Sequence, residues 1–415
     1  MHSNLKKDIE TLIKTLKDSK KEYLAREIEK NWHKTTLVYS KELNSWNPEK
    51  TMEPELFEAF DMELQRLEFD IVSRKKILSS IKRRRILQTA PHLVVTEGPR
   101  MLFINWLGSL GVPENDFYVV GAFSGNPFSN ITHPGRIQTK NEELNLIPSR
   151  MQDALVYRSK IAKELPEKLE SLPDKLKNFL SPAIPDNSYA KWAIQNCQRI
   201  NKKVLGKNNI VYVDINEVVA QYLVKILEKT SHILYKVFFH TETRKQFMKT
   251  FPNETMFYVP VLKGKYAKME NMVFSGESLK SKNREILLNN PKNLINEIKN
   301  EQLCPSLLLV FIVLCFFNRF KCFGSFAQVE YLPAYQKKLA KLEFLHKFKI
   351  ETMPTSNLTF GIFPDDSTIF PADLITKGEI LKQKKDILFG EILLGVKDRL
   401  TSGYFTRDNK TNGKK

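Results

Sequence analysis

The chain has 415 residues, of which 42% are hydrophobic and 27% are charged. These proportions are ordinary for a folded protein, and 16 glycines with 20 prolines are too few for a low-complexity or collagen-like chain. A formal net charge of +18 predicts attraction to anions, such as nucleic acid, an anionic membrane face or a phosphorylated or carboxylated ligand. The alternative is that many of the lysines, which stand beside glutamates in helical stretches, only form solvated helix faces.

The cysteines and the N-terminus bear on the location of the protein. Cys197, Cys304, Cys315 and Cys322 have no CxxC spacing, so we predict neither a disulfide framework nor a metal site. Free cysteines used as small apolar residues favour a reducing compartment, and we expect a cytoplasmic protein. The first residues, MHSNLKKDIETLIKTLKD, lack the apolar segment of a secretory signal.

Residues 1–88 are predicted to form a helical N-terminal region. The apolar residues of LKKDIETLIKTLKD recur with the spacing of one helical face, and FEAFDMELQRLEFDIVSRKKILSSIKRRRIL (57–87) predicts a second, longer helix. This second helix ends in the basic cluster Lys82, Arg83, Arg84 and Arg85. Such a cluster can contact nucleic acid or phosphate, but it is also typical of the solvated end of a helix.

The pattern then changes to alternating strands and helices. PHLVVTEGPRMLF (91–103) contains a short β-branched run and a turn, INWLGSLGVPEN (104–115) is helical, and FYVVGAF (117–123) is a second apolar run. Strand, helix and strand in this order indicate a parallel sheet with helical crossovers, so residues 89–137 are the first part of the core. In such sheets ligands bind beyond the carboxyl ends of the strands.

The rest of the chain continues this organisation. We predict a helical insertion over 138–188, including SRMQDALVYRSKIAKEL (149–165), and a second part of the core over 189–345. A C-terminal α/β segment (346–402) and a disordered tail (403–415) follow. The expected fold class is α/β, a Rossmann-like parallel sheet core with a helical N-terminal region and an inserted helical segment.

Within the second part of the core, several elements can be placed. We expect helices over 189–205 and 216–239, strands over 209–215 and 255–262, and a turn followed by helices over 272–300. PSLLLVFIVLCFFNRF (305–320) has only 11 consecutive apolar residues, Leu307 to Phe317, whereas a membrane-spanning helix needs about 20. We therefore predict a buried core element and no transmembrane segment.

The loop FSGNPFSNITHPGR (123–136) is the main candidate site, because the chain contains no GxxxxGK[ST], GxGxxG, HExxH or GxSxG motif. Its short polar side chains and freed backbone N–H groups can line an anion-binding concavity. Arg136 can bind a carboxylate or phosphate in bidentate fashion, and His133 can act as general acid or base. The predicted substrate-orienting residues of the loop are Ser124, Gly125, Asn126, Ser129 and Asn130. The same residue types are also ordinary in turns.

The turn TEGP (96–99) forms the second part of this candidate crevice. Thr96, Glu97 and Gly98 follow the first predicted strand and would lie at the same edge of the sheet as the loop. As in the loop, these residue types are equally compatible with a plain turn.

Several segments together resemble a known family. VVTEGPRMLF (94–103), FYVVGAFSGN (117–126), VFFHTETRKQF (237–247), CPSLLLVFIVLCFF (304–317) and CFGSFAQVEY (322–331) occur in the order and spacing of bacillithiol synthase, the cysteine-adding enzyme. Gly324 and Tyr331 fall in register with the family motif Tyr-Val-Gly-Gly-Pro-Gly-Glu-Ile-Ala-Tyr. The resemblance covers residues 93–345 and implies a Rossmann-like core, an inserted connecting region and helical appendages.

The resemblance also has departures, which lie where the chemistry would be. Glu97-Gly98-Pro99 replaces the family's Gly-Gln-Gln, residues 123–126 replace an acidic, histidine-bearing loop, Leu308-Leu309-Val310 replaces Leu-Arg-Pro, and Gln328 replaces the motif glutamate. The family's C-terminal dimerisation coil is not evident. On this resemblance, Gln328 and Tyr331 would close the far wall of the crevice.

Two functions follow as expectations. The first is a ligase- or transferase-type enzyme acting on a nucleotide-like or acidic small molecule, with amino-acid (cysteine) addition as one version and the cofactor unidentified. The alternative is a catalytically inactive relative that acts as a basic binding protein for an acidic macromolecular partner. Nucleic acid is not the favoured partner.

Overall fold

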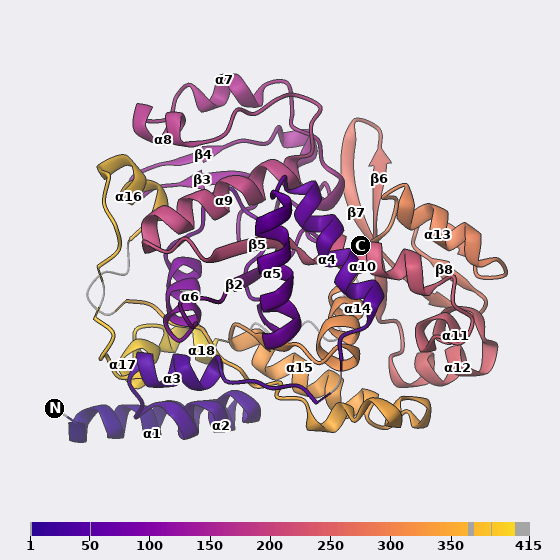
Figure 1. Ribbon diagram of the computed structural model, residues 1–415, viewed down its shortest axis with the longest axis horizontal. Coiled ribbons are helices and arrows are strands. Elements are labelled where there is room, and N and C mark those ends of the chain that lie inside the picture. Colours follow the sequence, from indigo (N-terminus) through magenta and orange to yellow (C-terminus); the bar gives the residue numbers. More distant parts are fainter. Residues whose placement is uncertain (1, 50, 364–368, 383, 403–415) are drawn as a thin grey trace, which may run out of the picture.

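The computed structural model describes residues 2–49, 51–363, 369–382 and 384–402. At its centre lies a four-stranded sheet with the strand order β11-β1-β2-β5, in which every pair of neighbours is parallel. The strands are β1 (Ile86–Gln88), β2 (Tyr118–Ala122), β5 (Ile210–Asp214) and β11 (Lys321–Phe323). Helices surround this sheet (Figure 1), which confirms the predicted α/β, Rossmann-like fold.

The apolar runs YVVGA and IVYVD form the two longest central strands because both faces of this sheet are covered. All ten residues of β2 and β5 are buried, as expected for a parallel sheet between helices. The two strands pair from Tyr118 with Ile210 to Ala122 with Asp214. At Gly121 in β2, a Cβ atom would lie 2.3 Å from Cγ2 of Ile215, the residue that follows β5. Only glycine therefore fits at this position of β2.

The first strand of the sheet lies elsewhere than predicted. It is formed by residues 86–88, whereas Leu93–Val95 are buried without belonging to a strand. Near them, an isolated bridge joins His92 to Phe123, the residue after β2. Arg85 adopts a left-handed conformation (φ +45°) that ends the preceding helix, so the next residues can extend. The predicted N-terminal region, 1–88, therefore includes β1, which belongs to the central sheet of the core.

The N-terminal region is helical, as predicted. It contains α1 (His2–Asp18), α2 (Glu22–Asn31), α3 (Thr36–Leu43), α4 (Pro54–Arg66) and α5 (Ile71–Arg84). The single long helix expected over 57–87 was wrong, because Glu68 has a φ of +66° and the Asp70 carboxylate accepts the backbone N–H groups of Val72 and Ser73, which starts a new helix. Helices α1 and α2 lie along one edge of the molecule, whereas α4 contacts β5 (Figure 1).

Three further helices pack around the central sheet. They are α6 (Pro99–Leu110), which contacts β2, and α9 (Tyr189–Leu205) and α10 (Ile215–Ile226), which contact β5. Helix α9 is confirmed at its predicted bounds, where Ser188 caps its start and Gly206 (φ +62°) ends it. The helix expected over 216–239 is divided into α10 and α11 (Ile233–Phe239), because the His232 side chain caps a new N-terminus.

A second sheet was not predicted. It is antiparallel, with the order β10-β6-β7-β8-β9. Its strands are β6 (Thr255–Lys263), β7 (Tyr266–Ser275), β8 (Ser278–Lys280), β9 (Glu285–Leu287) and β10 (Cys304–Pro305). Gly264 and Gly276, both with positive φ, allow the tight hairpin turns. The expected helices over 272–300 are therefore limited to α13 (Pro291–Lys299), which lies beside this sheet with α11 and α12 (Thr241–Thr250) in Figure 1.

The segment 138–188 is less helical than predicted. It holds the short helices α7 (Leu165–Leu169) and α8 (Asp174–Phe179), two 3₁₀ turns, η1 (Ser149–Met151) and η2 (Val156–Arg158), and the strand β4 (Glu143–Asn145), which pairs with β3 (Arg136–Gln138). The helix expected over 149–165 does not form. Its backbone instead bonds to the candidate loop, where the N–H of Val156 donates to the carbonyl of Asn126 at 2.9 Å.

The apolar run 305–320 is a buried core element, as predicted. It forms α14 (Leu307–Phe311) and a π-helical turn, η3 (Ile312–Phe317), and is followed by β11 and α15 (Phe326–Leu339). In the described part of the chain, no helix has the length and apolar character needed to cross a membrane.

The C-terminal segment packs against the rest of the molecule. It contains η4 (Glu343–Phe348), η5 (Ile350–Thr352), α16 (Pro371–Lys377), α17 (Phe389–Leu394) and α18 (Lys397–Thr401). The described residues of 346–402 form no strand, although strands were expected there. They form two isolated bridges, one between Leu358 and Gly324 and one between Leu388 and Thr35. The predicted tail, 403–415, lies outside the described residues.

Candidate functional site

The start of the candidate loop lies at the carboxyl edge of the central sheet. Ser124 and Gly125 follow β2, and Asp214 ends the neighbouring strand β5, so the parallel pairing brings them together. The Ser124 hydroxyl donates to Oδ1 of Asp214 at 2.7 Å. The side-chain oxygen of Asn216 accepts the backbone N–H groups of Ser124 (2.9 Å) and Gly125 (3.1 Å). We call the resulting group of buried polar residues the carboxyl-edge cluster: Glu63, Ser124, Tyr157, Asp214, Asn216 and Glu217.

Helix α4 supplies the second carboxyl group of this cluster. Oε1 of Glu63 accepts the backbone N–H of Asp214 at 2.9 Å, and Arg66 donates to both oxygens of Glu63, at 2.6 and 2.9 Å. Arg66 is paired with Glu63, and the charges of Asp214 and Glu217 also act on its guanidinium. Burial and the nearby Glu63 raise the pKa of Asp214 to about 7, against the lowering effect of Arg66. The pKa of Asp214 therefore lies close to neutral pH.

The third carboxyl group, that of Glu217, is bound from the inserted segment. The Tyr157 hydroxyl donates to Oε2 of Glu217 at 2.8 Å, and the backbone N–H of Tyr157 donates to the carbonyl of Ser124 at 3.0 Å. Gly125 closes the packing, since a Cβ atom there would lie 2.7 Å from Nδ2 of Asn216. Ser124 and Asp214 are fully enclosed, whereas Gly125 and Arg66, whose side chain is 28% exposed, form the outer rim.

The TEGP turn belongs to a second, deeper polar network. Glu97 is fully buried, and its carboxylate accepts hydrogen bonds from Nδ2 of Asn105 (2.9 and 2.8 Å) and from the hydroxyl of Tyr212 (2.9 Å). Burial raises the pKa of Glu97 to about 7. Gly98 is the N-cap of α6, and the buried hydroxyl of Thr96 has no partner within the described residues. The structure thus places Thr96 and Glu97 in the interior of the core and Gly98 at a partly exposed position at the start of α6.

The reversal of strand order lies between β1 and β11, where a Rossmann-like sheet usually opens into a crevice. Here the Thr89 hydroxyl lies 3.1 Å from Oε1 of Gln328 and 2.9 Å from the carbonyl of Phe323, and Gln328 is buried. At Gly324, a Cβ atom would lie 2.4 Å from Cδ of Gln328, and the backbone N–H of Gly324 donates to the carbonyl of Asn357. The chain's own residues therefore fill this position.

Tyr331 lies one helical turn beyond Gln328 on α15. Its ring is 5.8 Å from that of Phe311, which in turn lies 5.9 Å from that of Phe123, at the head of the loop. Burial raises the pKa of Tyr331 well above its ordinary value. Tyr331 therefore belongs to an apolar cluster behind the loop.

The second half of the loop lies away from the carboxyl-edge cluster. The Ser129 hydroxyl donates to Asp153 at 3.1 Å, and Asn130 accepts the backbone N–H of Thr132 at 3.0 Å. His133, with a φ of +55°, is the turn residue before the β3–β4 hairpin. In that hairpin Arg136 forms an ion pair with Glu143. These contacts are those of a surface turn.

The structure thus brings together Ser124, Gly125 and the neighbouring buried Asn126, but not His133 or Arg136. Sequence reasoning missed Glu63, Tyr157, Asp214, Asn216 and Glu217 as members of the site. One signal for three of them was available, because NIVYVDINE places Asp214 directly at the end of a predicted strand. Glu63 and Tyr157 carry no such signal, since each is brought in by tertiary packing.

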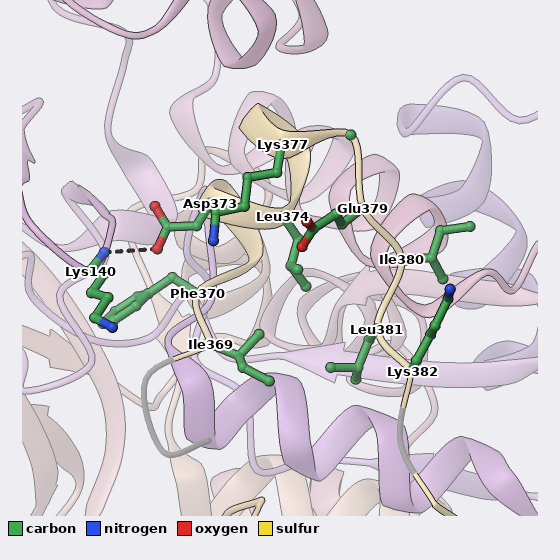
Figure 2. Close-up of a pocket in the computed structure, with 11 residues that line it drawn as sticks. Lys140, Ile369, Phe370, Asp373, Leu374, Lys377, Glu379, Ile380, Leu381 and Lys382 are labelled. Carbon is green, nitrogen blue, oxygen red and sulfur yellow. Dashed lines mark hydrogen bonds between the residues drawn. The ribbon is translucent and has the colours of Figure 1, made fainter. Parts of the chain in front are cut away.

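Two cavities lie elsewhere. One, of about 660 Å³, is bordered by α16 and the segment after it, with Lys140, Lys377 and Lys382 around it (Figure 2). The backbone N–H of Lys140 donates to Asp373 there at 2.9 Å, but the three lysine residues are exposed. A second cavity, of about 370 Å³, lies between α2, α3 and residues 354–357. Among the described residues, no group of three or more His, Cys, Asp or Glu side chains is arranged to hold a metal ion.

The basic cluster after α5 is tied to the fold. Arg83 pairs with Asp116, Arg84 donates to the carbonyl of Phe117 at 2.9 Å, and Arg85 is buried beside the carbonyl of Asn318. Only Lys82 and Arg83 are exposed. The cluster therefore fixes the end of α5 against the sheet and does not form a free cationic patch.

The fold and this geometry define a class. The chain is an α/β protein with a Rossmann-like parallel sheet and a buried cluster of carboxyl groups at the carboxyl edge. No known protein family has a model that matches this chain, and no curated protein matches it.

Proposed function

We propose that the protein is an enzyme of ligase or transferase type that acts on a nucleotide-like or acidic small molecule at the carboxyl-edge cluster. The observation that supports this proposal is the 2.7 Å hydrogen bond between Ser124 and Asp214, at the ends of two adjacent parallel strands, combined with a pKa near 7 for Asp214. A carboxyl group with such a pKa can accept and return a proton at neutral pH.

The proposed roles follow from the contacts. Asp214 removes the proton of the Ser124 hydroxyl, or of a substrate group that takes its place. Arg66 attracts the anionic part of the substrate, because it lies at the exposed rim and its Nη1 group has no hydrogen-bond partner among the described residues. We therefore assign to Arg66 and Asp214 the anion-binding and proton-transfer roles first expected of Arg136 and His133.

The resemblance to bacillithiol synthase is compatible with this proposal and narrows it. Amino-acid addition, including that of cysteine, is one version. The departures at 97–99 and 123–126 favour a substrate different from that of the family. A cytoplasmic location fits an enzyme of small metabolites, since the cysteines are free and buried. The basic cluster 82–85 was one reason to consider a basic binding protein. It supports this alternative less, because Arg83, Arg84 and Arg85 form contacts within the fold.

A thermal-shift screen tests the proposal. Purified protein is melted with nucleotides, amino acids, dicarboxylates and sugar phosphates, because a bound ligand raises the melting temperature according to its concentration over its Kd. We expect one class to raise it by several degrees in the wild type and in Ser129→Ala, the matched loop control. The same class should have no effect on Ser124→Ala or Asp214→Asn.

This comparison requires that each variant melts cooperatively without ligand. As a second measurement, calorimetric titration determines the ligand affinity of Arg66→Gln, a substitution at the exposed rim of the cluster. A loss of affinity in Arg66→Gln is expected. If no ligand class shifts the wild type, or if every variant responds as the wild type does, the proposal is wrong.

A further inference from the structure

The 370 Å³ cavity combines a buried amine, that of Lys321, with the half-buried carboxyl group of Glu27. It lies where α2 and α3 meet the start of the edge strand β11, and Glu27, Lys30, Tyr39 and Lys321 are among the residues that line it. Neither the carboxyl-edge cluster nor the cavity of Figure 2 shares a lining residue with it. Its chemistry is therefore independent of the proposed function.

Lys321 is the first residue of β11, and its side chain points away from bulk water. Its Nζ donates to the carbonyls of Glu42 (3.1 Å) and Ser45 (3.3 Å), and the residue is only 8% exposed. Burial lowers the pKa of Lys321 to about 8, although Glu27 opposes this effect. About a tenth of the amine is then neutral at pH 7, far more than for an ordinary lysine, and a neutral lysine amine is a nucleophile.

Glu27 lines the same cavity, and its charge acts on the Lys321 amine. Its Oε1 accepts Nδ2 of Asn31 at 2.9 Å and lies 3.1 Å from the hydroxyl of Tyr39. The Tyr39 hydroxyl also lies 2.7 Å from the carbonyl of Leu358, so its single proton is shared between two acceptors. Burial raises the pKa of Glu27 to about 7. Glu27 can thus both give and take a proton at the pH at which Lys321 is partly neutral.

We infer that this cavity binds a small carbonyl compound with an anionic group, an oxo acid or a phosphorylated aldehyde, and that Lys321 forms an imine with it. The amine nitrogen attacks the carbonyl carbon, and one of its protons moves to the former carbonyl oxygen to give a neutral carbinolamine. Glu27 protonates the hydroxyl group, which leaves as water while the C=N bond forms, and the nitrogen returns its excess proton to the Glu27 carboxylate. Lys30 is exposed at the cavity and attracts the anionic group.

Lys207 offers a matched control in the same chain. Burial also lowers its pKa to about 8, and its Nζ donates to the carbonyl of Ser109 at 2.5 Å. It lines neither of the two cavities described above. The comparison of Lys321 with Lys207 therefore separates the effect of the cavity and its acid from that of a low amine pKa.

Reductive trapping tests the imine. The full chain is incubated with glyoxylate or with pyridoxal 5′-phosphate in the presence of cyanoborohydride, and peptide mass spectrometry locates the resulting secondary amine. We expect modification of Lys321 at least about tenfold faster than that of Lys207, and its loss in Lys321→Arg but not in Lys207→Arg. Modification spread evenly over Lys321, Lys207 and the surface lysines with both aldehydes would overturn the inference.

Glu27→Gln gives a second readout that does not depend on the folding of the lysine variant. Because the charge of Glu27 raises the pKa of Lys321, its removal leaves more neutral amine, and trapping would become faster if amine basicity alone set the rate. If Glu27 transfers the proton, trapping at pH 7 becomes slower, by about tenfold or more. A rate equal to or above that of the wild type contradicts the role of Glu27.

Discussion

The carboxylate of Glu63 accepts the backbone N–H of Asp214 at 2.9 Å, and this bond joins helix α4 to the carboxyl end of β5. Glu63 belongs to the N-terminal helical region, whereas Asp214 ends a strand of the core. The N-terminal helices therefore contribute a side chain to the candidate site and are not a separate appendage.

The pH dependence of stability tests the environment of Asp214. Its pKa is about 7 in the folded protein and near 3.8 when unfolded, so between these values the native state holds a proton that the unfolded chain releases. This contribution is fully present below about pH 4 and is lost as the pH rises through 7. We expect the wild-type free energy of unfolding to fall between pH 6 and pH 8, with about 1 kcal/mol due to Asp214.

Asp214→Asn removes this contribution, and urea denaturation at the two pH values measures it. A smaller slope of the same sign should remain, because burial raises the pKa of Glu97 and Glu27 as well. An unchanged slope in the variant would show that Asp214 is ionised throughout this range.

Arg84 is expected to act as a structural residue. Its guanidinium donates to the carbonyl of Phe117 at 2.9 Å and to the side chain of Asn44, and the residue is buried. We predict that Arg84→Ala lowers the free energy of unfolding by about 2 kcal/mol, whereas Lys82→Ala, at an exposed position of the same cluster, changes it by less than about 0.5 kcal/mol. Equal effects of the two substitutions in urea denaturation would contradict this assignment.

Gly121 is expected to tolerate no side chain. A Cβ atom at this position would lie 2.3 Å from Cγ2 of Ile215, at the junction of β5 and α10. Gly121→Ala should therefore lower stability by about 1–3 kcal/mol, through displacement of α10 from the strand. Gly98→Ala is the control, because the nearest atom would lie 3.8 Å away, and its melting temperature should stay close to that of the wild type.

The filled position between β1 and β11 gives a prediction for Gln328. Its Nε2 donates to the carbonyl of Phe323 at 3.3 Å, and a glutamate, the residue found in the bacillithiol synthase motif, would place an oxygen against that carbonyl. We expect Gln328→Glu to lower stability by about 1–3 kcal/mol in urea denaturation at pH 8. The exposed Gln65→Glu serves as the control, and similar values for both would mean that the position between the strands can open.

The elements predicted correctly are those with a long, regular pattern. Helix α9 has a clear apolar face with a serine cap and a terminal glycine, and β5 is a continuous apolar run. In the second sheet, β6 was predicted over 255–262, whereas β8 and β9 were missed because they have three residues each. The three-residue β1 was assigned to the helix before it. Such short strands are fixed by their neighbours in space, which a linear pattern does not contain.

The candidate site was predictable only in part, for a similar reason. Ser124 and Gly125 could be placed at a strand end from the apolar run before them. Glu63 looks like any charged residue of a surface helix until α4 packs on β5, and His133 looked catalytic because a turn and a pocket share the same residue types.

The pairing of Ile86 with Lys321 places one of the latest strands of the chain beside the earliest. During synthesis, β1 therefore leaves the ribosome long before its neighbour exists, and one of its edges stays unpaired until residue 323 has cleared the exit tunnel. The nascent protein must thus keep an unfinished sheet from aggregating for most of its translation. We expect it to rely on chaperones that shield exposed strands, and to fold mainly after most of the chain has been made.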